Sequence, residues 1–241
     1  MKVLGIIGIR SGSKGVKDKN IKLLFGKPLV KWIIDTAQKS KSINRLIVST
    51  DSIEYAKIIK GFGVEVPCLR PSELALDHST DIEYVIHMLE WLKTNEGYVP
   101  DIVIRLMATV PMQESEDIDA LIEILKNDKF ASSAVVISES RQHPMKALKI
   151  IEDGLGATKL VNYFTETGRD VTPVSRQQYP KAYFRSNIVA SRIETIYNTN
   201  TLTGDIVKYH IIPQDRAIDI DNEVDFIIIE SLLKLKKYPD K

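Results

Sequence analysis

An apolar segment followed by a basic, glycine-containing loop opens the chain. Residues 3–9 are mostly apolar, which is typical of a strand buried on both faces of a parallel sheet. The loop at residues 10–20 is rich in Gly, Ser and Lys, and Pro28 then begins an amphipathic run, as expected at the first position of a helix. The order of strand, flexible loop and helix predicts an α/β protein with a loop at the carboxyl end of its first strand.

This loop has the composition of a phosphate-binding segment. It carries four cations, Arg10, Lys14, Lys17 and Lys19, with glycine and serine between them. Glycines let the backbone N–H groups approach an anion, and the cations neutralise its charge. A solvated surface loop is the alternative. The glycines lie at positions 8, 12 and 15, which matches neither the P-loop nor the dinucleotide fingerprint.

The first half of the chain alternates helical and extended patterns. We expect helices at 29–39, 53–61 and 81–96, a helix at 115–127 capped by Ser115, and strands at 45–50, 64–67, 101–107 and 132–138. Short connections between them predict right-handed βαβ units and a doubly wound, mainly parallel sheet flanked by helices. Ligands bind such sheets beyond the carboxyl ends of the strands, where the basic loop emerges.

Residues 139–183 differ in character, with polar turns and little periodicity. The segment is too short and polar to form a core of its own, so we interpret it as an insertion in a single domain that covers residues 1–241. A strand at 185–191 then returns to the sheet, and residues 222–235 predict a closing amphipathic helix.

Composition excludes several classes of protein. The 241 residues have a formal net charge of +1, so no overall field favours nucleic acid or a membrane surface. The single cysteine, Cys68, allows no intramolecular disulfide, and one thiol with four histidines gives no zinc-ligand spacing. No leader or membrane-spanning run is evident. We therefore expect a cytoplasmic protein that uses neither nucleic acid nor a membrane as its partner.

A pair of carboxylates near the end of the chain suggests a metal site. Asp219 and Asp221 share one face of an extended segment because side chains alternate along it. Mg²⁺ prefers a few carboxylate oxygens together with phosphate oxygens and waters. The alternative is that Asp221 and Asn222 cap the last helix while Asp219 is solvated.

A second cationic region lies late in the predicted insertion and just after it. It combines cations with amides, at Arg176, Gln178, Lys181, Arg185 and Asn187. Arginine binds a carboxylate bidentately and amides bind hydroxyls, so this composition suits a small polyol that bears a carboxylate. A polar surface without a ligand is the alternative reading.

The chain resembles the sugar-acid cytidylyltransferases, in particular the acylneuraminate cytidylyltransferase family. The resemblance runs in the same order along nearly the whole chain and rests on Arg10–Gly15, Lys19–Asn20, Ile47–Asp51, Leu69–Ala75 with Asp77, His143–Lys146, Arg176–Gln178, Tyr183–Arg185 and Ile218–Asp221. It implies a Rossmann-like nucleotidyltransferase domain whose insertion is exchanged with a partner in a homodimer. It also implies Mg²⁺-dependent transfer of CMP from CTP to the anomeric hydroxyl of a 2-keto-3-deoxy sugar acid, such as sialic acid or a related nonulosonic acid, with release of pyrophosphate.

The resemblance also implies roles for individual residues. Catalysis would fall to Arg10, Lys14, Lys19, Asp219 and Asp221, with the two aspartates holding Mg²⁺. The nucleotide would be bound by Arg10, Ser13, Lys14, Lys19, Asn20, Arg70, Asp77 and Ser79. The sugar would be bound by Lys146, Arg176, Gln178, Tyr183 and Arg185. Phosphoryl transfer depends mainly on positioning and charge neutralisation, which this set would supply.

The chain departs from the family pattern at two places. Met107 and Gln113 stand where the family usually has glutamine and arginine, and Ser186-Asn187 replaces a glycine-containing turn. A thioether lacks the donors and acceptor of an amide, which suggests an acceptor other than ordinary sialic acid. Two alternatives stay open. One is a nucleotidyltransferase for an eight-carbon ulosonic acid or a sugar phosphate, and the other is a catalytically silent nucleotide-binding homologue.

Overall fold

A computed structural model describes residues 1–13, 15–152, 154, 156, 158–164 and 178–237. The chain divides into two compact units, residues 1–137 with 185–241 and residues 138–184. The predicted insertion, residues 139–183, falls inside the second unit, and its role in dimerisation and sugar binding stays a prediction.

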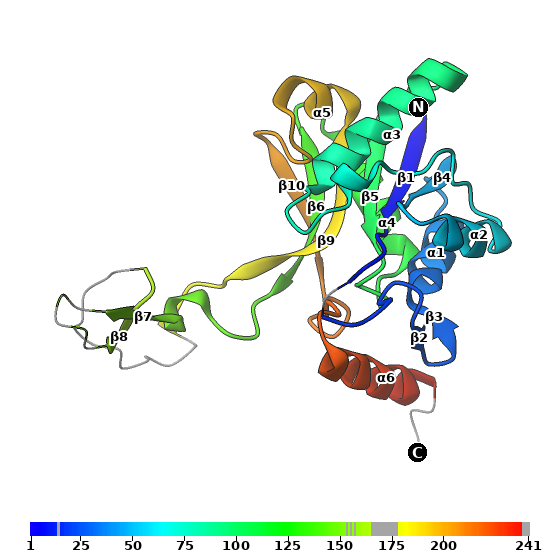
Figure 1. Ribbon diagram of the computed structural model, residues 1–241. Helices are drawn as coiled ribbons and strands as arrows, with labels where there is room; N and C mark the ends of the chain where they lie inside the picture. Colours follow the sequence, from blue (N-terminus) through cyan, green and yellow to red (C-terminus); the bar gives the residue numbers. More distant parts are fainter. Residues whose placement is uncertain (14, 153, 155, 157, 165–177, 238–241) are drawn as a thin grey trace. The chain divides into compact units, whose positions relative to one another are not determined.

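A six-stranded sheet lies at the centre of the first unit (Figure 1). Its strands, in the order β10-β6-β9-β5-β1-β4, are β10 Val207–Ile212, β6 Ser133–Glu139, β9 Tyr183–Arg192, β5 Ile102–Met107, β1 Val3–Gly8 and β4 Arg45–Ser49. Strand β1 pairs in parallel with β4 and β5, whereas β9 runs antiparallel to β5. The predicted α/β class is confirmed, and the sheet is mixed but mostly parallel.

Helices cover both faces of this sheet because its central strands are apolar on both sides. On β1, Val3 and Ile7 belong to one buried cluster while Leu4 and Ile6 belong to another. The first cluster contains residues of α1 Leu29–Lys39, α2 Ile53–Gly61 and α4 Ser115–Asn127. The second contains residues of α3 Asp81–Glu96 and α5 Ile193–Thr199. The result is the three-layer arrangement that parallel sheets require.

A third apolar cluster connects the two ends of the chain. Helix α6, Glu223–Lys237, packs Phe226 and Ile229 against Val16 of the basic loop and Ile220 of the acidic segment. A short hairpin of β2 Leu23–Leu24 and β3 Lys27–Pro28 adds Leu24 to this cluster. The helix therefore fixes the loop beside the segment that carries Asp219 and Asp221.

The remaining elements are short. A 3₁₀ turn, η1 Ser72–Leu74, lies between α2 and α3. The second unit contains the 3₁₀ turn η2 Pro144–Lys146 and an antiparallel pair, β7 Leu148–Glu152 and β8 Thr158–Asn162. Among the described residues, none of the helices has both the length and the apolar character that crossing a bilayer demands.

Three local predictions were wrong. Residues 64–67 form a single parallel bridge, Ile47 to Glu65, rather than a strand, because Pro67 has no N–H group with which to extend the pairing. Glu114, and not Ser115, caps α4 through a reciprocal pair of hydrogen bonds with Asp117. Pro28 lies one residue outside α1, at its cap position. Helix α5 and the β2–β3 hairpin were not predicted at all.

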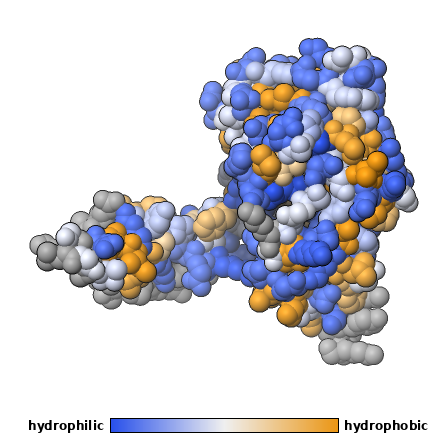
Figure 2. All heavy atoms as spheres, viewed as in Figure 1, coloured by the Kyte–Doolittle hydropathy of each residue, from blue (hydrophilic) through white to orange (hydrophobic). Residues whose placement is uncertain are grey.

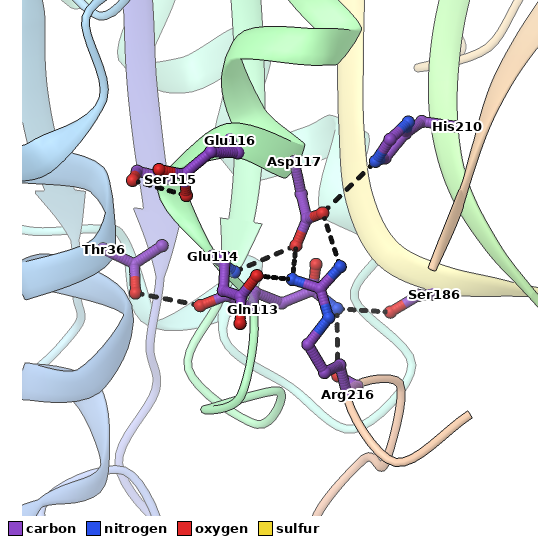
Figure 3. Close-up of polar contacts among 9 residues, drawn as sticks. All are labelled: Thr36, Gln113, Glu114, Ser115, Glu116, Asp117, Ser186, His210 and Arg216. Carbon is purple, nitrogen blue, oxygen red and sulfur yellow. Dashed lines mark hydrogen bonds and ion pairs between the residues drawn. The ribbon is translucent and has the colours of Figure 1, made fainter. Parts of the chain in front are cut away.

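Helix α4 is tied to β10 and the following turn by a buried carboxylate (Figure 3). Asp117 is 1% exposed and accepts two hydrogen bonds from the Arg216 guanidinium, at 2.9 and 3.0 Å. The His210 ring nitrogen lies 3.2 Å from the same carboxylate, and Glu114 also pairs with Arg216. This network stabilises the turn that leads to the acidic segment.

Replacing Asp117 with alanine tests this network. The change leaves the Arg216 guanidinium without its bidentate partner, and we expect a loss of about 2 to 4 kcal/mol in the free energy of unfolding, since Glu114 still faces Arg216. Urea unfolding measures the loss. Glu123→Ala, at an exposed position of the same helix, is the control and should change stability by less than about 0.5 kcal/mol. Equal stability of the two variants would contradict the account.

Candidate active site

A cleft of about 370 Å³ lies beyond the carboxyl ends of β1 and β5. Its lining comes from the loop after β1, from the segment between α2 and α3, from the start of α3, from the end of β5 and from Asp221. The strand order places β1 between β4 and β5, so the chain crosses to either side of it. Such a switch point is where open α/β sheets bind their ligands.

The basic loop is held in place without regular secondary structure. Asp51, which follows β4, accepts hydrogen bonds from the backbone N–H and the hydroxyl of Ser11, at 2.9 and 2.6 Å. The Asn20 side chain donates to the Arg10 carbonyl at 3.0 Å. Gly12 adopts a φ of +71°, a conformation that favours glycine. These contacts fix the start and the end of the loop at the mouth of the cleft.

The loop also contacts the acidic segment directly. The Lys19 ammonium donates a hydrogen bond to the Ile220 carbonyl at 2.7 Å, and its nitrogen lies 3.6 Å from the Asp221 carboxylate. A Cβ atom on Gly15 would lie 2.5 Å from the Asp221 carbonyl oxygen, so only glycine fits at this position. The structure thus brings together two segments about 200 residues apart.

The two aspartates of this segment differ in environment. One oxygen of Asp219 accepts a hydrogen bond from the Asn187 amide, while the other is buried with no hydrogen-bond partner among the described residues. Burial raises the pKa of the Asp219 carboxyl, and the nearby Asp221 charge raises it further, while the neighbouring Thr109 hydroxyl, the Lys19 charge and the Asn187 amide oppose this effect. The Asp221 side chain is 78% exposed.

This pair fits a hard divalent cation. A buried carboxylate oxygen without a partner is costly unless a cation or a donor reaches it. The described residues contain no cluster of three or more His, Cys, Asp or Glu suited to a metal. A cation held by Asp219 and Asp221 would therefore need further ligands from phosphate and water, which is the usual arrangement for Mg²⁺.

Arg70 is a buried cation at the wall of the cleft. It is 6% exposed and donates to the Ser49 hydroxyl and carbonyl at 3.0 and 2.9 Å. Its guanidinium carbon lies 4.2 Å from the ring centroid of Tyr84, a cation–π contact. Burial lowers the pKa of Arg70. These contacts fix the orientation of the guanidinium group at the cleft wall.

Asp77 and Ser79 shape the segment that faces the basic loop. The Arg10 guanidinium donates to the Asp77 carboxylate at 2.8 Å and to the Ala75 carbonyl at 3.2 Å. The Ser79 hydroxyl donates to the Glu73 carbonyl and accepts from the Leu76 N–H group, each at 3.0 Å. Both predicted nucleotide contacts line the cleft, and in this structure they also hold Arg10 and the turn in place.

Most residues that were predicted to bind the nucleotide line the cleft. The described residues that were predicted to bind the sugar do not line it and are divided between the two units. The cleft is lined by Arg10, Ser13, Lys19, Asn20, Arg70, Asp77, Ser79 and Asp221. Lys14 and Arg176 lie outside the described residues. Lys146, Gln178 and Tyr183 belong to the second unit, and Arg185 is exposed on β9 in the first. The role of these residues in sugar binding stays a prediction.

Met107 and Gln113, which together form the first departure from the family pattern, have different surroundings. Met107, at the end of β5, lines the cleft. Gln113 is 4% exposed and is not a cleft residue; its amide nitrogen donates to the Ser186 hydroxyl at 3.2 Å and to the Arg216 carbonyl at 3.3 Å (Figure 3). The change at Gln113 therefore acts on packing between β9 and the turn at Arg216, while the change at Met107 alters the wall of the cleft.

Sequence reasoning missed three residues beside this cleft. Asp81 and Tyr84, from the first turn of α3, line it, and Arg105 of β5 lies nearby with its Nε 3.5 Å from the Asp81 carboxylate. Tyr84 has helical spacing that is typical of packing, so nothing marked it. Arg105 did carry a signal, because it is a charged residue within an otherwise apolar strand.

The geometry of the cleft defines a class of protein. A cationic loop after a parallel strand, next to two carboxylates and a buried arginine, is typical of an α/β protein that binds a nucleotide phosphate.

Comparisons with known proteins agree with this class. The family model described as Cytidylyltransferase matches residues 4–207. The chain is similar to the post-translational flagellin modification protein B of Campylobacter coli, at 30% identity over 99% of this chain and 98% of that protein. It is similar at 29% identity to the CMP-N,N'-diacetyllegionaminic acid synthase of Legionella pneumophila, over 98% of each chain.

A third relative is longer. The N-acylneuraminate cytidylyltransferase of Escherichia coli is 26% identical over 93% of this chain, which spans about half (50%) of that protein. Among solved structures, the CMP:2-keto-3-deoxy-manno-octonic acid synthetase complexed with CTP matches with a TM-score of 0.72 and 15% identity, over 98% of this chain and 100% of that chain, which shows a shared fold. The chain belongs to the cytidylyltransferase family, a family of CTP-dependent enzymes.

Replacing Gly15 with alanine tests the contact between the loop and the acidic segment. The new Cβ would meet the Asp221 carbonyl and push the two segments apart, so we expect CTP affinity to fall about tenfold or more, the equivalent of about 1.4 kcal/mol. Isothermal titration calorimetry with CTP measures the change.

Gly61→Ala is the matched control for this change. Gly61 ends α2 and has open space around its Cβ position, so this variant should bind CTP like the wild type. Wild-type affinity in Gly15→Ala would contradict the geometry.

Proposed function

We propose that this enzyme transfers CMP from CTP to the anomeric hydroxyl of a 2-keto-3-deoxy sugar acid of the nonulosonic class, with release of pyrophosphate. The observation that carries the proposal is the Lys19 ammonium, which joins a phosphate-type loop to the carbonyl between Asp219 and Asp221. Family membership supports the use of CTP. The name of a relative that is matched over 98% of its length supports a sugar acid as acceptor, and so does the name of a longer relative of which this chain spans about half (50%).

In this proposal the chain contributes positioning and charge. The anomeric oxygen attacks the α-phosphorus of CTP and its hydroxyl proton passes to solvent water. The bond between the α-phosphorus and the oxygen that bridges to the β-phosphate breaks, so that pyrophosphate leaves. Lys19, Arg10 and the backbone N–H groups of the loop hold the β- and γ-phosphates and stabilise the charge that develops as they leave. Arg10 begins from its ion pair with Asp77 and is one-third exposed (33%), so phosphate can reach it.

Asp219 and Asp221 would hold Mg²⁺ together with phosphate oxygens. When bound, the ion neutralises charge on the α-phosphate and helps to activate the acceptor hydroxyl. Two contacts orient these carboxylates. The Asn187 amide donates a hydrogen bond to one oxygen of Asp219, and the Ile220 N–H group donates to the Thr109 carbonyl at 2.8 Å, which holds the backbone between the two aspartates.

Arg70 would face the nucleoside end of CTP. Its guanidinium is locked by Ser49 and Tyr84 at the cleft wall. Two of its nitrogens are already bonded to Ser49, which leaves Nη1 to donate to a carbonyl or hydroxyl of the nucleotide. A planar donor held in this way discriminates between ligands by geometry.

The side chain of Met107 supports a proposal on the class of sugar acid that serves as acceptor. A thioether in the cleft wall offers no amide hydrogen bond, so a substituent of the acceptor at this position would contact it through apolar atoms. We infer a nonulosonic acid other than sialic acid. The relative named as a CMP-N,N'-diacetyllegionaminic acid synthase supports this class.

We further propose a homodimer that forms through the second unit. Apolar side chains reach the surface of this unit (Figure 2), among them Leu148, Ile150, Leu160, Phe164 and Phe184, with Ile150 72% exposed. An exposed apolar patch of this kind marks an interaction surface. Sedimentation equilibrium tests the proposal, and a monomer at micromolar concentration would contradict it.

The activity is tested by pyrophosphate release from CTP and Mg²⁺ with a panel of nonulosonic and eight-carbon ulosonic acids and sugar phosphates. We expect release with a nonulosonic acid, and a loss of about 10²-fold or more in kcat for Asp221→Ala, because this carboxylate would hold the Mg²⁺ that neutralises negative charge developing in the transition state. Asp205→Ala, which removes an exposed carboxylate outside the cleft, is the control and should retain full activity.

Two other results of this assay would contradict the proposal. Release with an eight-carbon acid or a sugar phosphate alone would contradict the proposed acceptor class. CTP binding without release for every acceptor would contradict transfer and favour a silent homologue.

A further inference from the structure

Asn187 connects β9 to the carboxylate pair. Its side-chain nitrogen donates a hydrogen bond to Oδ2 of Asp219. The Oδ1 atom of the same carboxylate is buried and has no hydrogen-bond partner among the described residues. The Thr109 hydroxyl, also buried without a described partner of hydrogen-bond geometry, lies near this carboxylate and lowers its pKa. The Asn187 amide is thus the side chain that holds Asp219 by a hydrogen bond, through one oxygen.

The chemistry of this donor suits a metal ligand. A neutral amide fixes the orientation of a carboxylate and leaves its full negative charge, whereas a lysine or arginine at the same place would neutralise it. Loss of a partner that orients a metal ligand in this way typically lowers metal affinity by about 10- to 100-fold.

Asn187 is in turn held from the neighbouring strand. The Arg105 guanidinium on β5 donates through Nη1 to the Asn187 carbonyl at 3.0 Å. Arg105 is 3% exposed, and its Nε lies 3.5 Å from Asp81 at the start of α3. A buried charge of this kind is costly unless it has a fixed set of partners. The arrangement therefore runs from the cleft wall at Asp81 through Arg105 and Asn187 to Asp219.

We propose that Asn187 is a positioning residue for Asp219: it holds Oδ2 so that Oδ1 stays directed to a divalent cation bound with CTP, and Arg105 keeps Asn187 at the required position on β9. The inference rests on the proposed use of Asp219 and Asp221 as metal ligands. It assigns a function to the position where this chain departs from the glycine-containing turn of its family.

A purely structural role predicts a different behaviour from a positioning role. If Asn187 only stabilised β9, its loss would weaken CTP binding equally with and without metal. If it positions Asp219, its loss weakens only the contribution of the metal. The ratio of the CTP dissociation constants without and with saturating Mn²⁺ separates the two, because Mn²⁺ is a hard cation that binds the same oxygen ligands as Mg²⁺.

The experiment is isothermal titration calorimetry of CTP on the full chain, in a chelator and then in saturating Mn²⁺. We expect Mn²⁺ to strengthen CTP binding to the wild type. In Asn187→Ala this ratio falls about tenfold, while the affinity for CTP without metal stays unchanged. Asn187→Ser, whose shorter side chain cannot reach Asp219, gives the same result and covers the case in which the alanine variant does not fold.

Ser186→Ala is the matched control. Ser186 is the preceding residue on the same strand, is 6% exposed and bonds to Gln113, which is not a cleft residue. This variant should keep both the metal-free affinity and the Mn²⁺ ratio of the wild type.

The outcomes separate this inference from the proposed function. The inference is overturned if both Asn187 variants keep the wild-type ratio of CTP dissociation constants, or if they lose CTP affinity equally with and without Mn²⁺. It is also overturned if Mn²⁺ has no effect on CTP binding to the wild type. Acceptor turnover is measured separately, so an enzyme that couples Mn²⁺ to CTP but transfers to no sugar acid contradicts the proposed function alone.

Discussion

The hydrogen bond from the Lys19 ammonium to the Ile220 carbonyl is the contact on which the cleft depends. It places the cationic loop at residues 10–20 against the segment that carries Asp219 and Asp221, and the apolar cluster that contains Val16 and Ile220 supports the same contact. If the cations of the loop paired directly with the carboxylates, their charges would cancel and neither would be free to bind a ligand. Here the ammonium bonds mainly to a neutral carbonyl, which leaves charge of both signs available for phosphate and for a cation.

The fold supplies the rigid support for this contact. Because β1 is buried on both faces, its carboxyl end is held by packing from both sides of the sheet. Helix α6 packs on Val16 and Ile220 together, so the end of the chain fixes the loop near its start. The site is thus built on elements that cannot move independently, which favours the precise positioning that phosphoryl transfer needs.

Much of the fold and part of the site could be predicted from the sequence. Strand β1 and helices α1 to α4 follow from periodicity and turn residues, and the cationic loop follows from composition. The meeting of Lys19 with Asp221 does not, because no local pattern encodes a contact between segments so far apart; it was implied by resemblance alone. Residues 64–67 have the composition of a strand but make only one bridge, and Gln113, which stands where the family usually has an arginine, is buried in packing. The roles of Tyr84 and Arg105 depend on neighbours from other elements of the fold, which the sequence does not specify.

The most direct test of the account is a crystal structure of the full chain with CTP and Mn²⁺, with the metal located by its anomalous scattering. The account predicts an anomalous peak bound by Asp219, Asp221 and a phosphate oxygen of CTP, with the triphosphate on the loop at residues 10–20. A metal held by the nucleotide alone and away from both aspartates, or a triphosphate bound elsewhere, would contradict it.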